Sequence, residues 1–111
     1  MTVFVLTCGD QVALRKRPES GLLAGLWEFP HVPGKLEPEE AIGCLGLPIR
    51  GISRQLERKH IFTHGQWNMR CFYLECAEPA GDFVWMDCSQ VEAEAALPTA
   101  FRKFWEEKNR V

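Results

Sequence analysis

The spacing of hydrophobic residues changes along the chain, and it indicates strands over most of the sequence. Apolar and β-branched residues fill Thr2–Thr7, and turn-forming residues at Cys8–Gln11 precede a second apolar segment at Val12–Arg17. This order predicts an opening β-hairpin. Alternation in the second strand puts Arg15 and Arg17 on one face, which predicts that this face is solvated, as at the edge of a sheet.

Further strands are predicted in the second half of the chain. The strongest signal is at Trp67–Cys76, where apolar and polar residues alternate, and similar signals cover Ser53–Ile61 and Phe83–Met86. The residues Phe62–Gln66 are expected to form a hairpin tip or loop between the first two of these strands. The glycine-rich segment Gly21–Pro30 is interpreted as a loop that enters a short buried strand.

Two helices are predicted. Glu37–Leu45 has proline and acidic residues in its first turn, and Gly43 and Gly46 limit it to about two turns. In the tail, Pro98 suits the first position of a longer helix. The spacing i, i+3, i+4 and i+7, which is that of one helical face, is kept by Phe101, Phe104, Trp105 and Lys108. Strands that precede and surround two helices give an α+β fold, and 111 residues is the length of one domain.

Composition is that of a soluble globular protein, with 46% hydrophobic and 25% charged residues, which argues against disordered, collagen-like and coiled-coil classes. We expect Trp27, Phe29 and Trp105 to anchor the core. No apolar run approaches the ~18 residues of a membrane span, and the opening segment lacks the flanks of a signal peptide. The five cysteines contain no C-x-x-C pair and are expected to be buried free thiols. These features predict a cytoplasmic protein without a membrane partner.

The net charge of −2 argues against non-specific binding to nucleic acid or to anionic membranes. The charges are nevertheless segregated along the chain. Residues 50–70 carry five basic side chains and one acid, Glu57, whereas residues 71–94 contain six acids and no base. The basic segment is where an anion would approach, unless the two segments are simply two solvated faces.

The chain contains few patterns associated with catalysis or metal binding. His60 and His64 have the i, i+4 spacing of a helical metal site, but the residues between them favour a strand. Phosphate-binding glycine loops and nucleophile elbows are absent from the sequence. The adjacent glutamates at 39–40 and 106–107 suit solvated helix surfaces better than a pair of glycosidase carboxylates. No catalytic residue and no metal ligand is therefore predicted.

Three segments, in this order, resemble one protein family. They are RKRPESGLLAGLWEFP at Arg15–Pro30, HIFTH at His60–His64 and LPTAFRK at Leu97–Lys103. Together they are similar to the C-terminal domain of the MutY family of adenine DNA glycosylases, which remove adenine mispaired with 8-oxoguanine. The resemblance implies a Nudix-like fold over residues 1–111, with a mixed β-sheet flanked by helices in an α/β/α sandwich. It also implies a domain cut from a larger enzyme, whose missing N-terminal domain holds the catalytic groups and an iron–sulfur cluster, so no cofactor is expected here.

Hydrolases of the Nudix type carry a box, G-x5-E-x7-R-E-U-x-E-E-x-G-U, whose carboxylates hold divalent metal ions. Gly34 and Glu40 keep the first spacing, but Pro48 and Ile49 occupy the place of the R-E pair, and residues 41–53 contain no acid. A hard cation would find no cluster of oxygen ligands in such a segment. We therefore expect a domain that keeps the fold for recognition and does not hydrolyse diphosphates.

The resemblance assigns lesion recognition to the loop residues Phe62, Thr63 and His64. Oxidation turns guanine N7 from an acceptor into an N–H donor and adds an acceptor oxygen at C8. The Thr63 hydroxyl can accept from N7–H or donate to that oxygen, and His64 can act in the same way at the base edge. Phe62 is expected to wedge or stack at the neighbouring step. Each residue also has a structural interpretation. Phe62 would pack in the core, Thr63 would stabilise a turn and His64 would lie on the surface.

Arg54, Arg58 and Lys59 lead into this loop, and we expect them to contact phosphates, which position a protein on DNA without specifying sequence.

The predicted function is recognition of 8-oxoguanine paired with adenine in duplex DNA during base excision repair, beside the N-terminal glycosylase domain. Two alternatives stay open. One is a Nudix-type hydrolase of oxidised nucleotides, and the other is a protein-interaction module that uses the acidic residues 71–94.

Overall fold

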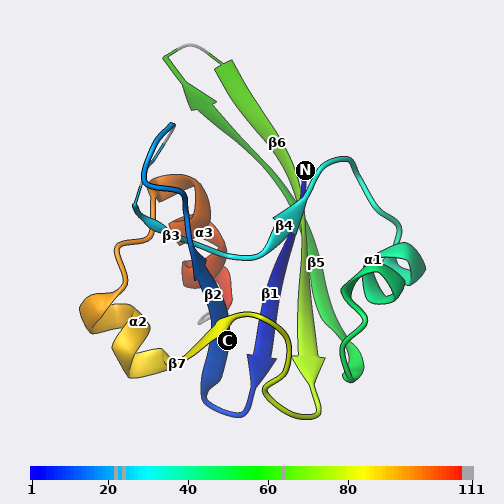
Figure 1. Cartoon of the computed structure of the whole chain (residues 1–111). Helices are drawn as coiled ribbons and strands as arrows, with labels where there is room; N and C mark the ends of the chain where they lie inside the picture. The colour runs from blue at the N-terminus through cyan, green and yellow to red at the C-terminus, as the bar shows by residue number, and fades with distance from the viewer. Residues whose placement is uncertain (22, 24, 64, 109–111) are drawn as a thin grey trace.

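The structure is a computed structural model that describes residues 1–21, 23, 25–63 and 65–108. Its elements, in chain order, are β1 (Thr2–Cys8), β2 (Gln11–Lys16), β3 (Trp27–Glu28), β4 (His31–Val32), α1 (Pro38–Leu45), β5 (Ile49–Phe62), β6 (Gly65–Cys76), β7 (Val84–Asp87), α2 (Cys88–Glu94) and α3 (Thr99–Lys108). A mixed β-sheet forms the middle layer, with α1 on one side and α2 and α3 on the other (Figure 1). The predicted mixed sheet flanked by helices is confirmed.

The sheet has the strand order β3-β2-β1-β6-β5, and its two central strands, β1 and β6, are parallel. The strands β4 and β7 join it by pairing with β1 and β2. Antiparallel pairing of Thr7 with Val12 confirms the predicted opening hairpin. The predicted position of the second strand at a sheet edge is wrong, because β2 pairs with β1, β3 and β7.

Arg15 of β2 and Arg17, which directly follows this strand, are bound by one buried carboxylate. The side chain of Glu28 is 6% exposed, and its two oxygens accept hydrogen bonds from Arg15 Nε at 2.7 Å and from Arg17 Nη1 at 2.6 Å. The strand β3 brings Glu28 directly opposite Arg15. The face that was predicted to be solvated is therefore a partly buried ion cluster.

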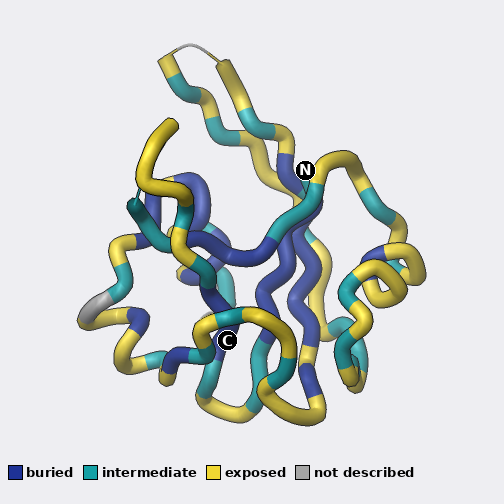
Figure 2. The backbone as a smooth tube through the Cα atoms, in the orientation of Figure 1, coloured by how far each residue is buried: buried dark blue, intermediate teal, exposed yellow. Residues whose placement is uncertain are grey.

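Side chains of the central strands alternate between two cores, and the buried positions concentrate on β1 and β6 (Figure 2). The α3-side core includes Val3, Val5, Met69, Cys71, Tyr73, Phe101 and Phe104, and the α1-side core includes Phe4, Leu6, Ala41, Phe72 and Leu74. Phe29 and Trp105 are buried and Trp27 packs against the α3-side core, as predicted. Because one strand supplies both cores, the sheet is apolar on both faces.

Two expectations from composition can be compared with the structure. The described cysteines are all free, and Cys71 and Cys76 are buried as expected, whereas Cys44 is exposed. In the part of the chain that the structure describes, every helix is too short or too polar to cross a membrane.

The predicted two-turn helix is confirmed as α1. Glu37 caps its first turn, and the backbone N–H of Glu37 donates to the Glu40 side chain at 3.1 Å. Pro38 occupies the first turn, where its missing N–H costs no helical hydrogen bond. Gly46 ends the helix in the left-handed region at φ 61°, a conformation that glycine adopts without steric cost.

The prediction of two helices is wrong, because α2 is a third helix between β7 and α3. Asp87 and Gln90 form a capping box at its start, a pattern that is visible in the sequence. Val91 is a buried residue of this short helix. The strand β4 was also missed. It exists through long-range pairing of Thr2 with Val32 and of Val3 with His31.

A long hairpin formed by β5 and β6 extends beyond the body of the domain (Figure 1), and exposure rises toward its end (Figure 2). The predicted strands are confirmed, although β5 begins at Ile49, before the predicted start, and has irregular register near Ile52. The last rung pairs Phe62 with Gly65. The turn therefore falls inside the predicted tip, and Thr63 lies at the projecting end.

Candidate nucleic-acid interface

Thr63 occupies the tip of the hairpin and is exposed. Within the described residues its hydroxyl makes no hydrogen bond, so the oxygen is available to a ligand as both donor and acceptor. His64, the third residue of the predicted recognition loop, lies outside the described residues. A two-stranded ribbon with an exposed end has the dimensions that the major groove of B-DNA admits.

Phe62 is half-buried and forms part of a series of aromatic contacts below the tip. Its ring meets His60 at 4.6 Å and Trp67 at 4.8 Å between centroids, both edge to face. Trp67 in turn contacts Phe101 of α3 at 5.7 Å. Pairs of this geometry add about 0.5–1.5 kcal/mol beyond the burial of their area. The contacts favour the structural interpretation of Phe62, in which it fixes the direction of the hairpin.

The three basic residues that were predicted to contact phosphates do not share one face of the hairpin. Arg58 pairs with Met69, whose side chain belongs to the α3-side core, whereas Lys59 pairs with Asn68 on the opposite face. Adjacent strand residues point to opposite sides. Arg54 lies opposite Tyr73 and therefore shares the face of Arg58.

Arg54 and Arg58 both reach toward the end of α3. Arg54 Nη1 donates to the Glu107 carbonyl at 3.0 Å and to its carboxylate at 3.2 Å. Arg58 Nη2 lies 3.9 Å from the other carboxylate oxygen of Glu107. Lys59 is exposed and has no acidic partner among the described residues. Of the three predicted cations, Lys59 is the one with the fewest contacts inside the domain.

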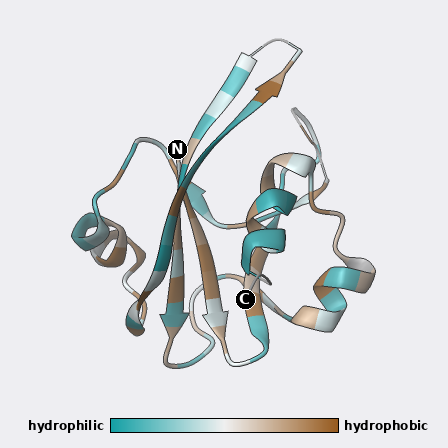
Figure 3. Ribbon diagram, turned by 180° about the vertical axis from the view of Figure 1, so that it is seen from behind, coloured by the Kyte–Doolittle hydropathy of each residue, from teal (hydrophilic) through white to brown (hydrophobic). Residues whose placement is uncertain are grey.

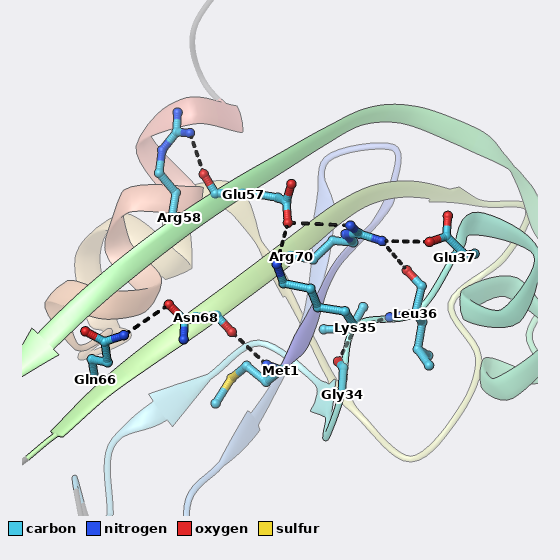
Figure 4. Close-up of polar contacts among 11 residues, drawn as sticks. Met1, Gly34, Lys35, Leu36, Glu37, Glu57, Arg58, Gln66, Asn68 and Arg70 are labelled. Atoms are coloured by element: carbon cyan, nitrogen blue, oxygen red, sulfur yellow. Dashed lines mark hydrogen bonds and ion pairs between the residues drawn. The ribbon is translucent and has the colours of Figure 1, made fainter.

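The opposite face of the hairpin carries a cluster of charged side chains (Figure 4). Lys35 Nζ binds Glu57 at 3.1 Å, and Arg70 Nη2 lies 3.5 Å from the same oxygen. Arg70 Nη1 also contacts Glu37 at 3.3 Å. The hydrogen bond and charge of Lys35, followed by the charge of Arg70, hold the pKa of the Glu57 carboxyl below its usual value. Sequence reasoning missed Lys35, which the fold brings to the hairpin from the segment before α1.

A groove of about 350 Å³ adjoins this cluster and is lined by Lys35, Glu57, Arg58, Lys59, Asn68 and Met69. Its polar donors face solvent at the base of the projecting hairpin. Among the described residues that line the groove, Lys59 is exposed and has no acidic partner, so it can meet an external anion. The groove suits a phosphate group better than an apolar ligand.

The residues that keep the first spacing of the Nudix box have structural roles. The carboxylate of Glu40 closes the capping box of α1, and Gly34 adopts a positive φ of 83° in the preceding turn. His60 lies on β5 instead of a helix, so the i, i+4 spacing to residue 64 does not stack two rings on one helical face. Across the described ranges, no group of three or more His, Cys, Asp or Glu residues is arranged to hold a metal ion.

Comparison with known proteins gives consistent matches. A family model described as the NUDIX domain matches residues 2–107. The adenine DNA glycosylase of Mus musculus is 34% identical in an alignment of 110 residues. The match covers 89% of this chain and 19% of that protein. The adenine DNA glycosylase of Schizosaccharomyces pombe is 32% identical over 97 residues, with 71% and 21% covered. The chain thus spans about a fifth of the length of these relatives.

Two solved structures share the fold. A Nudix hydrolase from M. smegmatis, RenU, matches with a TM-score of 0.68 at 20% identity, over 96% of this chain and 81% of that one, which is a likeness of fold alone. The C-terminal domain of mouse MUTYH, solved in complex with human PCNA, matches with a TM-score of 0.70 at 27% identity, over 99% of this chain and 89% of that one. The chain belongs to the NUDIX domain family, and within it resembles adenine DNA glycosylases and the C-terminal domain of mouse MUTYH.

Proposed function

We propose that this chain is the noncatalytic C-terminal domain of an intracellular adenine DNA glycosylase, and that it recognises 8-oxoguanine paired with adenine in duplex DNA. In this proposal the catalytic groups and the iron–sulfur cluster belong to an N-terminal glycosylase domain that works beside it. The observation that carries the proposal is the exposed hydroxyl of Thr63 at the end of a projecting hairpin (Figure 1).

The chemistry of the lesion supports a hydroxyl as the recognising group. Guanine presents an acceptor at N7, whereas 8-oxoguanine presents an N–H donor there and a carbonyl oxygen at C8. The Thr63 hydroxyl oxygen accepts a hydrogen bond from N7–H of the lesion. In guanine, N7 is itself an acceptor, so the hydroxyl must rotate and donate its own hydrogen to make a bond there. A contact of this kind contributes about 1–2 kcal/mol, or roughly tenfold in affinity.

The test compares two variants at this position in a glycosylase that carries the domain. Thr63→Val keeps the shape and removes the hydroxyl, so we expect it to reduce the preference for 8-oxoguanine over guanine about tenfold. Thr63→Ser keeps the hydroxyl and should retain the preference. The measurement is the dissociation constant for duplexes that differ only in the base opposite adenine. An equal loss of affinity for both duplexes in Thr63→Val would contradict the assigned role.

A protein-binding role is the second candidate, since the similar domain of mouse MUTYH was solved in a complex with human PCNA. The acidic residues 71–94 are the segment that sequence analysis assigned to such a role. Titration of the domain with PCNA and, separately, with lesion duplex distinguishes the two candidates. Binding to PCNA together with no preference for lesion DNA would favour the second.

A further inference from the structure

Ile61 is the most exposed of the large hydrophobic residues in the described part of the chain. The residue is 70% exposed, compared with 47% for Val84 and 37% for Ile42. It precedes Phe62, and the end of β5 is a hydrophobic segment on an otherwise polar hairpin arm (Figure 3). A single exposed apolar residue is ordinary on a protein surface. This one lies beside the tip to which we assign DNA recognition, and this position makes duplex DNA the ligand to consider.

Strand register decides which way Ile61 points. Rungs of the hairpin pair Glu57 with Arg70, Lys59 with Asn68 and Ile61 with Gln66. Because side chains alternate along a strand, these six residues share one face, which we call the polar hairpin face. The contact of 3.5 Å between Arg70 and Glu57, and the hydrogen bond of 3.4 Å between Gln66 and Asn68, agree with this assignment.

Phe62 points to the opposite face, where it packs on Trp67 and His60. The role of an apolar wedge, which the sequence assigned to Phe62, therefore requires breaking aromatic contacts. Ile61 requires no such rearrangement, because its side chain already faces solvent. Isoleucine is also among the residues that proteins insert between base steps, where they unstack the bases and bend the duplex.

The charge of the polar hairpin face is complementary to DNA. No acid occurs between Arg58 and Arg70 in the sequence. The acid at the base of this face, Glu57, is bound by Lys35 at 3.1 Å. Lys59 is exposed and lies two residues before Ile61, a separation of about 6.8 Å along a strand. This corresponds to roughly two base-pair rises of B-DNA, at ~3.4 Å each.

We propose, on the basis of the proposed function, that Ile61 enters the base stack of duplex DNA beside the lesion while Lys59 contacts a phosphate about two steps away. Phe62 then acts as a positioning residue, and Arg54 ties the hairpin to α3 instead of binding DNA. The DNA-facing surface is thus the polar hairpin face.

The test uses the 111-residue chain at low ionic strength and a duplex with 2-aminopurine next to 8-oxoguanine, because 2-aminopurine brightens when it is unstacked. Wild type should raise the fluorescence. Ile61→Ala should abolish the rise and weaken binding about tenfold, a factor that corresponds to about 1.4 kcal/mol. Ile42→Ala, the same change on α1, should behave as wild type. Ile61→Lys should also lose the rise although it adds a cation, which separates insertion from simple attraction.

Lys59→Ala should lower the slope of log affinity against log salt by about one unit, while Lys103→Ala on α3 should leave it unchanged. If wild type prefers the lesion duplex but Ile61→Ala keeps the fluorescence rise, this inference is overturned and the proposed function stands. If wild type unstacks 2-aminopurine equally beside guanine, lesion recognition fails and the role of Ile61 stands. A wild-type chain that binds no duplex overturns both.

Discussion

Replacing Glu28 by glutamine tests whether the buried ion cluster holds β2 and β3 together. In the wild type, Arg15 and Arg17 donate to the two carboxylate oxygens of Glu28 at 2.7 and 2.6 Å. The substitution keeps one acceptor oxygen but replaces the other with an NH₂ group, which faces one of the two guanidinium groups. Hydrogen bonds to charged groups contribute about 1.5–3 kcal/mol each, and breaking a fully buried ion pair costs about 3–5 kcal/mol. Arg15 is 40% exposed, so water compensates part of its loss. We expect a destabilisation of about 2–3 kcal/mol.

Thermal unfolding followed by circular dichroism measures this effect. In a domain of this size 1 kcal/mol shifts Tm by ~4–8 °C, so Glu28→Gln should lower Tm by roughly 10–20 °C. Glu39→Gln is the matched control, because Glu39 is exposed in the first turn of α1, and it should change stability by less than about 0.5 kcal/mol. Equal melting of the two variants would refute the view that Glu28 stabilises the sheet.

Three further predictions concern single groups. Burial lowers the pKa of His31, so in acid the unfolded chain binds more protons than the folded one. Tm should therefore fall as pH decreases below about 6.5, and His31→Gln should remove this part of the pH dependence of Tm between pH 5 and 7. Tyr73→Phe should lower the free energy of unfolding by about 1–2 kcal/mol in urea, because the hydroxyl donates to the buried Phe104 carbonyl at 2.7 Å. A thiol reagent should modify exposed Cys44 first and Cys71 only on unfolding, since burial raises the pKa of the Cys71 thiol, and Cys44→Ser should remove the fast phase.

Most of the sheet was predictable because its strands carry their own signal. The alternation of β6 between residues 67 and 76 was visible, and the structure uses both sets of side chains, one for each core. The strand β4 has only two residues and exists through pairing with β1, so no local sequence pattern predicts it. In α2, Val91 is buried but no long apolar stripe is present, and only the Asp87 and Gln90 capping box marked its start.

The sequence did not show how the three predicted phosphate-contacting residues are arranged in space. Arg58 and Lys59 are adjacent in the chain, and the alternation of a strand alone puts them on opposite faces. The register shift before Arg54 could not be anticipated, nor could its pairing with Glu107 from α3. Lys35 joins the hairpin only because the turn before α1 packs against β5 and β6.

In the proposed function, one hydroxyl can discriminate between two bases only if the hairpin that carries it is held in place. A hydrogen bond of ~1 kcal/mol discriminates between the bases only if its donor and acceptor are held in fixed positions, and ordering the loop on binding would lower the affinity for both bases by ~1–2 kcal/mol for each backbone residue. The contacts from Phe62 through Trp67 to Phe101 hold the hairpin against α3. Phe62→Ala should therefore weaken lesion discrimination although Phe62 faces away from the polar hairpin face, and Phe62→Leu should restore part of it by refilling the packing site.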